Sequence, residues 1–218
     1  MNLRYSESDR AFREKAREWL ALHVPKCRRP ANGQTSAQYD RDWQRKLFEH
    51  GWAGVAWPTE FGGLGLTMAE ESQLVRILTR ASVTFRSLIG TTVGIGSQGI
   101  MIDGTEAQKA EWLPKFATGE AIASFALTEP GAGSDAASLR CSAVREGDHY
   151  RVNGTKRYIT NAPRATVFTL MARTEPDVKG AAGISAFIVP ADSPGISLGK
   201  PDRKMGQRGA KTCDVVLE

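Results

Sequence analysis

The sequence is poor in cysteine. It has three cysteines in 218 residues, and Cys27, Cys141 and Cys213 are far apart and show no Cys-x-x-Cys spacing. This pattern argues against a disulfide framework and against a zinc site. We therefore expect buried or chemically idle thiols and no metal centre.

A long apolar run is also missing. No stretch approaches the length that spans a bilayer, and the first residues, from Met1 to Tyr5, do not form the apolar core of a secretory signal. Hydrophobic residues make up 41% of the chain and charged residues 24%, as in an ordinary globular protein. We expect a cytoplasmic protein that does not enter a membrane.

The sequence has no large excess of one charge. Its formal net charge is +5, and the cations beside Pro25 and Pro30 fit a solvated loop better than a nucleic-acid patch. A later basic group could meet an anionic ligand, although exposed strand edges carry such charges too. Its members are Lys200, Arg203, Lys204, Arg208 and Lys211.

Helical periodicity and capping residues dominate the first 120 positions. The expected N-terminal caps are Ser6 or Ser8 for a helix over residues 6–24, Ser36 for a second helix ending before Gly51, Thr67 with Glu70 for a third, and Thr105 with Gln108 for a fourth. The stretch from 51 to 66, rich in tryptophan and glycine, is predicted to pack as an ordered connection.

From about residue 121 the periodicity becomes that of strands. Short strands are predicted at 141–145, 149–152, 155–159, 165–172, 184–189, 196–198 and 213–217. The pair Asn153-Gly154 is a strong signal for a two-residue hairpin. The pattern as a whole indicates a multi-domain α and β chain: an all-α helical domain over residues 1–120, followed by a small antiparallel β-barrel or sheet domain over residues 121–218.

Residues Gly94 to Gly99 match the Gly-x-Gly-x-x-Gly pattern of dinucleotide-binding folds. That motif requires a strand before it and a full helix after it, but only three apolar residues follow before Asp103-Gly104. Small residues such as Gly90, Thr91 and Gly94 fit a close approach of two helices better. A nucleotide-binding dehydrogenase stays open as a minor alternative.

The most informative stretch runs from Ala126 to Asp135. Gly131, Ala132 and Gly133 let a backbone pass close to a ligand, while neighbouring hydroxyls and amides point at its polar atoms. The apolar segment 121–127 predicts a buried strand that leads into this loop. A plain surface turn is the alternative.

A second signal follows the Asn153-Gly154 pair. Tyr158 and Thr160 lie two positions apart, so that on a strand both side chains would share one face. Such a pair can cover a planar ring and hydrogen-bond one of its heteroatoms, although an ordinary sheet aromatic beside a strand-end threonine gives the same pattern.

Taken together, these segments resemble the acyl-CoA dehydrogenase family. The similarity covers nearly the whole chain, and its main motif, residues 126–138, is highly specific. Further similar segments are 152–156, 158–161, 187–190, 194–196 and 205–208, with 52–65 and 104–119 resembling the family's helical domain.

The resemblance implies that the β-domain binds FAD. The residues that would line or hold the flavin are Phe125, Leu127, Thr128, Gly133, Ser134, Tyr158, Ile159 and Thr160, and Ser134 would also face the acyl-CoA. Tyr158 stands where the family often has tryptophan, and Thr160 would hydrogen-bond near flavin N5.

The resemblance also implies a reaction, the α,β-dehydrogenation of an acyl-CoA thioester to its trans-2-enoyl product, with an electron-transferring flavoprotein as electron acceptor. Family members usually take the catalytic glutamate and much of a dimer or tetramer interface from a third, helical domain. This sequence stops at Glu218. We therefore expect a fragment that contains no catalytic residue and is inactive as an isolated chain.

Two other hypotheses about the function also include a bound flavin. One is a flavin oxidase or monooxygenase of the same superfamily. The other is a non-catalytic flavin or acyl-CoA binding subunit that needs a partner chain, a reading motivated by the missing base.

Overall fold

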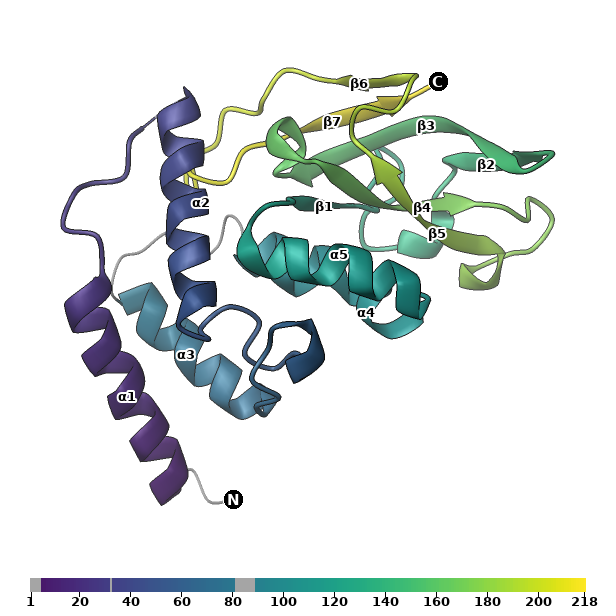
Figure 1. Ribbon diagram of the computed structural model, residues 1–218. Helices are drawn as coiled ribbons and strands as arrows, with labels where there is room; N and C mark the ends of the chain where they lie inside the picture. The colour runs from purple at the N-terminus through teal and green to yellow at the C-terminus, as the bar shows by residue number, and fades with distance from the viewer. Residues whose placement is uncertain (1–4, 32, 81–88) are drawn as a thin grey trace.

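The structure is a computed structural model and describes residues 5–31, 33–80 and 89–218. Helices occupy the first part of the chain, and the strands that follow form a curled sheet above α4 and α5 (Figure 1). Within the described ranges, every helix is too short or too polar to cross a bilayer. The helical elements are α1 (Glu7–His23), α2 (Gly33–Glu49), α3 (Met68–Arg80), the π-helix η2 (Ile89–Gly96), α4 (Ser97–Asp103) and α5 (Glu106–Thr118).

Capping residues fix three helix starts as predicted. Ser6 caps α1, where its Oγ accepts from the Asp9 amide at 3.1 Å and the Asp9 carboxylate accepts from the Ser6 amide at 3.0 Å. Thr67 with Glu70 and Thr105 with Gln108 form the same reciprocal bonds at α3 and α5.

The second helix starts earlier than predicted. It begins at Gly33, so Ser36 lies inside α2 and does not cap it. Ser36 is buried, and its Oγ accepts a hydrogen bond from Nη2 of Arg164 at 2.8 Å. Its hydroxyl therefore joins the helical part to the sheet part of the chain, which local sequence could not indicate. Gly51, at φ 74°, follows the end of α2 as the left-handed stop.

The dinucleotide-binding interpretation of Gly94 to Gly99 is wrong. These residues lie on η2 and α4, and no strand precedes them among the residues that the structure describes. The close approach that the structure shows is made by Gly96 to a strand residue. A Cβ on Gly96 would lie 2.8 Å from the Cβ of Ala123, whereas one on Gly90 would meet nothing within 4 Å.

The connection between α2 and α3 is ordered, as predicted. Trp52 and Trp57 are each 4% exposed and belong to the helical core. Gly63 is required there because a Cβ would lie 2.1 Å from the carbonyl oxygen of Trp57. The short 3-10 helix η1 (Thr59–Phe61) lies within the connection.

The sheet has seven strands and mixed pairing. Its strands are β1 (Ala123–Ala126), β2 (Ser142–Glu146), β3 (His149–Thr160), β4 (Val167–Arg173), β5 (Ile184–Pro190), β6 (Ile196–Leu198) and β7 (Thr212–Leu217). β4 pairs with β1 in parallel from Val167 to Leu170 and with β2 in parallel at one position, and the other pairs are antiparallel. The prediction of a helical part followed by a sheet is confirmed. The prediction of a purely antiparallel sheet is wrong, because β4, which follows the β2–β3 hairpin, lies parallel to β1.

The hairpin predicted at Asn153-Gly154 is also wrong. β3 continues through these residues, pairing first with β2 and then with β7. A Cβ on Gly154, whose φ is 151°, would lie 2.9 Å from Cα of Cys141. Glycine at this position lets the two backbones approach each other closely. The actual turn is at Gly147, where φ is 67°.

Candidate functional site

The glycine-containing loop leaves the end of β1 and makes a tight turn. The amide of Glu129 donates to the carbonyl of Ala132 at 3.0 Å, and the amide of Ala132 donates back to Glu129 at 3.2 Å. A Cβ at Gly131 or Gly133 would meet nothing within 4 Å. The loop therefore presents an open, small-residue surface.

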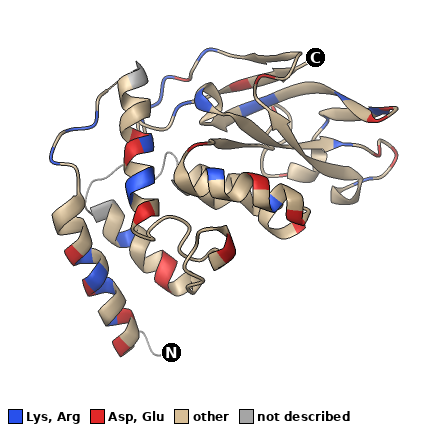
Figure 2. Ribbon diagram, in the orientation of Figure 1, with Lys and Arg blue, Asp and Glu red and all other residues tan. Residues whose placement is uncertain are grey.

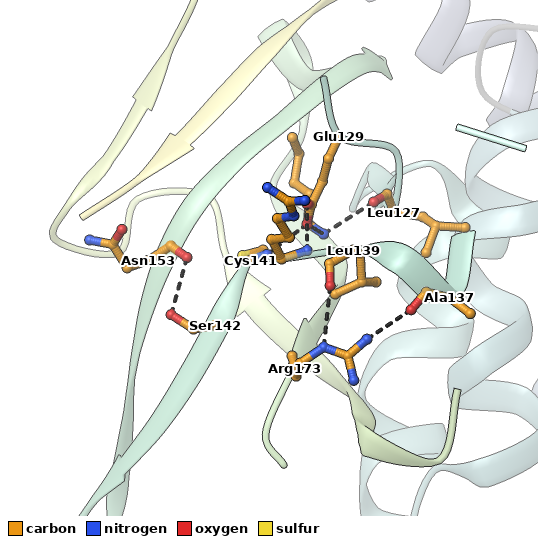
Figure 3. Close-up of polar contacts among 10 residues, drawn as sticks. Leu127, Glu129, Ala137, Leu139, Cys141, Ser142, Asn153 and Arg173 are labelled. Carbon is orange, nitrogen blue, oxygen red and sulfur yellow. Dashed lines mark hydrogen bonds and ion pairs between the residues drawn. The ribbon is translucent and has the colours of Figure 1, made fainter. Parts of the chain in front are cut away.

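A buried ion pair attaches this loop to strand β3. Nζ of Lys156, in β3, donates to Oε1 of Glu129 at 2.7 Å and to the carbonyl oxygen of Leu127 at 3.1 Å. Lys156 is fully buried and Glu129 is 8% exposed. Figure 3 shows Leu127 and Glu129 converging at this point. Since a buried charge without a partner is costly, the pair fixes the loop against β3.

Backbone amides complete the carboxylate's environment. Oε2 of Glu129 accepts from the Arg140 amide at 2.7 Å, and Oε1 accepts from the Cys141 amide at 2.9 Å. Burial by itself raises the pKa of Glu129, but the Lys156 ammonium and these two amides outweigh it and hold that pKa below its ordinary value. Glu129 is thus an ionised anchor in this structure, which does not suit a role as proton acceptor.

Arg173, in β4, fixes the far side of the loop. Its Nη2 donates to the carbonyl of Ala137 at 2.8 Å, and its Nε donates to the carbonyl of Leu139 at 3.3 Å (Figure 3). Both carbonyls belong to the segment around the short helix η3 (Ala136–Ser138). Lys156, which is buried, and Arg173, which is half-buried, therefore hold the two ends of the loop segment.

Tyr158 lies at a β-bulge. The register of β3 against β7 shifts between Lys156 and Ile159, and Tyr158 has a left-handed φ of 58°. Bulges re-aim side chains next to functional sites. Here the bulge leaves the Tyr158 ring 58% exposed, while Ile159 is 2% exposed and packs in the sheet core.

A backbone hydrogen bond joins the two signals found in the sequence. The amide of Arg157 donates to the carbonyl of Thr128 at 2.7 Å. Arg157 also places its guanidinium carbon 4.7 Å from the centre of the Tyr158 ring and pairs with Asp214 at 2.7 Å. The loop and the residue that carries the exposed aromatic ring are consequently neighbours in the fold.

The structure divides the predicted flavin residues into three groups. Phe125, Leu127, Thr128 and Thr160 are half-buried, and Gly133, Ser134 and Tyr158 are exposed. Ile159 is buried, so only its backbone can face a ligand. An exposed aromatic ring, nearby hydroxyls and an open small-residue surface fit a planar heteroaromatic group with polar edges.

Sequence reasoning missed Lys156 and Arg173 and took Glu129 only as part of the loop motif. No local pattern marks these residues, because charged side chains on loops and strands are ordinarily exposed. Their roles follow from the fold, which brings the loop against β3 and β4.

Comparison with known proteins agrees with this geometry. The family model "Acyl-CoA dehydrogenase, N-terminal domain" matches residues 6–120, and "Acyl-CoA dehydrogenase, middle domain" matches residues 124–218. An acyl-CoA dehydrogenase of Bacillus subtilis is 36% identical over 174 residues, which cover 80% of this chain and 46% of that protein.

Two solved structures are similar along nearly the whole chain. A glutaryl-CoA dehydrogenase from Mycobacterium smegmatis in complex with FADH2 has a TM-score of 0.79 and 29% identity, with 98% of this chain and 53% of that chain covered. The prolyl acyl carrier protein oxidase AnaB has a TM-score of 0.82 and 30% identity, with 99% and 57% covered.

The chain spans about half, or less, of the length of the curated relatives it matches. The two family models together account for nearly every residue described, in the same order as the helical part and the sheet. The chain belongs to the acyl-CoA dehydrogenase family.

Proposed function

We propose that this chain forms the flavin-facing part of an FAD-dependent acyl-CoA dehydrogenase. The observation that carries the proposal is the hydrogen bond from the Arg157 amide to the Thr128 carbonyl, which joins the open loop to the exposed Tyr158 ring. The FADH2 complex of the similar glutaryl-CoA dehydrogenase supports the choice of cofactor.

When bound, FAD supplies a hydride acceptor for the β-carbon of an acyl-CoA thioester, which becomes the trans-2-enoyl product. Tyr158 would pack beside the ring, and the Thr128 and Thr160 hydroxyls would hydrogen-bond its polar edge. Phe125 and Leu127 would line the ring, and the backbones of Gly133, Ser134 and Ile159 would continue the wall. Ser134 would also face the acyl-CoA.

The base that removes the α-proton is assigned to no residue of this chain. Glu129 is unsuitable because its carboxylate is bound to Lys156 and two amides. We therefore propose that the isolated chain is inactive, and that a further helical domain or a partner chain supplies the base. We also propose that an electron-transferring flavoprotein accepts the electrons and that the complete enzyme is a dimer or tetramer. We propose the cytoplasm as its location, since reducing conditions there suit the free thiols of Cys141 and Cys213.

The absorption spectrum of the purified chain mixed with FAD tests the cofactor proposal. A structured visible flavin band that stays with the protein through gel filtration is expected. Its absence from a folded chain would overturn the proposal that this chain forms the flavin-facing part of the enzyme.

The similarity to AnaB, an oxidase, supports a second candidate. In that case the same site would hold reduced flavin for reaction with oxygen. Oxygen consumption by the intact enzyme during turnover distinguishes the two, since a dehydrogenase requires a separate electron acceptor and consumes little oxygen.

A further inference from the structure

A groove rich in positive charge lies away from the loop and the Tyr158 ring. Two segments that are distant in sequence line it, residues 28–31 after α1 and residues 201–211 before β7, and it encloses about 970 Å³. Nη2 of Arg29 donates to the carbonyl of Gly209 at 3.4 Å across it. Figure 2 shows Lys and Arg on both segments where they border the upper end of α2. We name it the cationic groove and define it by Arg28, Arg29, Arg203, Lys204, Arg208 and Lys211.

Little negative charge faces these six cations. Asp202 is the one carboxylate among the described residues that line the groove, and its Oδ2 already accepts a hydrogen bond from the Thr212 hydroxyl at 2.7 Å. Behind the groove, Asp40 binds Arg29 through both of its oxygens at 2.6 Å each. The remaining cations repel one another, and an anionic ligand would relieve that repulsion.

The alternative origin of these charges is protection of an exposed sheet edge. Edge protection needs cations on one strand, pointing away from the protein. Here Arg28 and Arg29 come from a different segment and face the 201–211 segment across a concave space. The segment is also held in place, since the amide of Asp202 donates to the carbonyl of Thr212 at 2.9 Å and Nζ of Lys204 donates to the carbonyl of Ala210.

The lining indicates the ligand's chemistry. Four of the six cations are arginines, whose planar guanidinium groups bind phosphate oxygens in pairs. No aromatic side chain occurs among the described residues that line the groove, so it offers no platform for stacking the bases of single-stranded nucleic acid. The size is at the upper end of the range for small-molecule sites.

We propose that the cationic groove binds a ligand that carries a diphosphate group. Such a group can come from the flavin dinucleotide or from a separate phosphate-bearing metabolite. The groove adjoins a strand that pairs with the proposed flavin site, which brings the first source into consideration: Thr160 pairs with Thr212 across β3 and β7, and the Thr212 hydroxyl binds Asp202.

Titration calorimetry of the full 218-residue chain with inorganic pyrophosphate, at about 0.15 M salt, tests the proposal. We expect saturable binding to one site. The double variant Arg203→Gln/Arg208→Gln should weaken it at least about tenfold, since each arginine contributes charge-assisted hydrogen bonds. The control Arg10→Gln/Arg45→Gln removes the same charge from exposed positions on α1 and α2 and should change the affinity less than about twofold.

Absence of saturable binding, or an equal loss of affinity in both double variants, would overturn the proposal, provided that the variants unfold at the temperature of the parent. Repeating the titration with FAD present distinguishes the two sources. Competition with FAD assigns the groove to the dinucleotide's diphosphate, and unchanged affinity assigns it to a separate ligand. The pyrophosphate result does not depend on flavin binding, so failure of the proposed function leaves this test intact.

Discussion

The ammonium group of Lys156 lies 2.7 Å from Oε1 of Glu129, and neither side chain is accessible enough to be stabilised by water. The same nitrogen donates to the Leu127 carbonyl, so one buried cation fixes both a side chain and the backbone of the loop. Removing either partner leaves the other charge buried, and this arrangement therefore determines both the stability of the sheet and the shape of the candidate flavin site.

We predict that Lys156→Met lowers the free energy of unfolding by about 3 kcal/mol, since it leaves the Glu129 carboxylate without its counter-charge. Adding Glu129→Gln to that variant should restore part of the loss. Urea denaturation of the two single variants and the double variant measures the coupling. Strictly additive losses would show that the two groups do not stabilise each other.

The depressed pKa of Glu129 predicts a specific dependence of stability on pH. Because the folded chain holds this carboxyl deprotonated more strongly than the unfolded chain does, the stabilisation is fully present above the ordinary pKa of 4.5 and is lost as pH falls through the lower folded-state pKa. The stability advantage of the parent over Glu129→Gln should accordingly shrink below pH 4.5. Urea midpoints of both proteins, measured down to about pH 3, check this, and a constant difference would contradict it.

Tyr158→Ala should weaken FAD binding about tenfold while changing the free energy of unfolding by less than about 1 kcal/mol. The small stability effect follows from the 58% exposure of the ring. Tyr150→Ala is the matched control, since Tyr150 is also an exposed tyrosine of β3, at 43%, and packs against Phe187 away from the bulge. Fluorescence titration with FAD gives both affinities. Equal losses of affinity in the two variants would show that Tyr158 is not part of the flavin site.

Asp40→Asn should loosen the contact between the helices and the sheet. Asp40 is 4% exposed and accepts from Arg29 and, at 3.0 Å, from Arg164. Its replacement leaves two half-buried guanidinium groups without a counter-charge, and we expect a loss of about 3 kcal/mol in unfolding free energy. Asp42→Asn, at an exposed position of the same helix, should cost less than about 0.5 kcal/mol. Equal losses of stability in the Asp40 and Asp42 variants, measured by thermal unfolding, would show that the buried contact does not stabilise the fold.

Gly154 and Gly147 should respond differently to substitution. Gly154→Ala forces a Cβ against the backbone of Cys141 and should destabilise the chain by about 2 kcal/mol or more. Gly147→Asn places a residue that tolerates a left-handed φ at a turn with open space around it, and we expect a cost below about 1 kcal/mol. Thermal denaturation of the two variants measures the contrast, and a Gly154→Ala variant as stable as the parent would contradict the close approach.

Some features of this protein follow from neighbouring residues alone. The caps at Ser6, Thr67 and Thr105 were predicted because a capping box joins residues three positions apart. The small-residue loop and Tyr158 stand out as candidate site residues because small residues and an aromatic stand in a specific local order. For these features, the physical cause lies within a few residues of the chain.

Other features depend on residues that only the fold brings together. Asn153-Gly154 has the local chemistry of a hairpin, but close packing against Cys141 and pairing of β3 with both β2 and β7 keep the strand extended. Burial of Lys156 depends on Glu129, 27 positions away, and the cationic groove depends on segments at opposite ends of the chain. The sequence by itself therefore determined three helix starts and the family resemblance. Tertiary structure decided the strand pairing, the buried charges and the groove, because these energies arise between groups that have no local relationship.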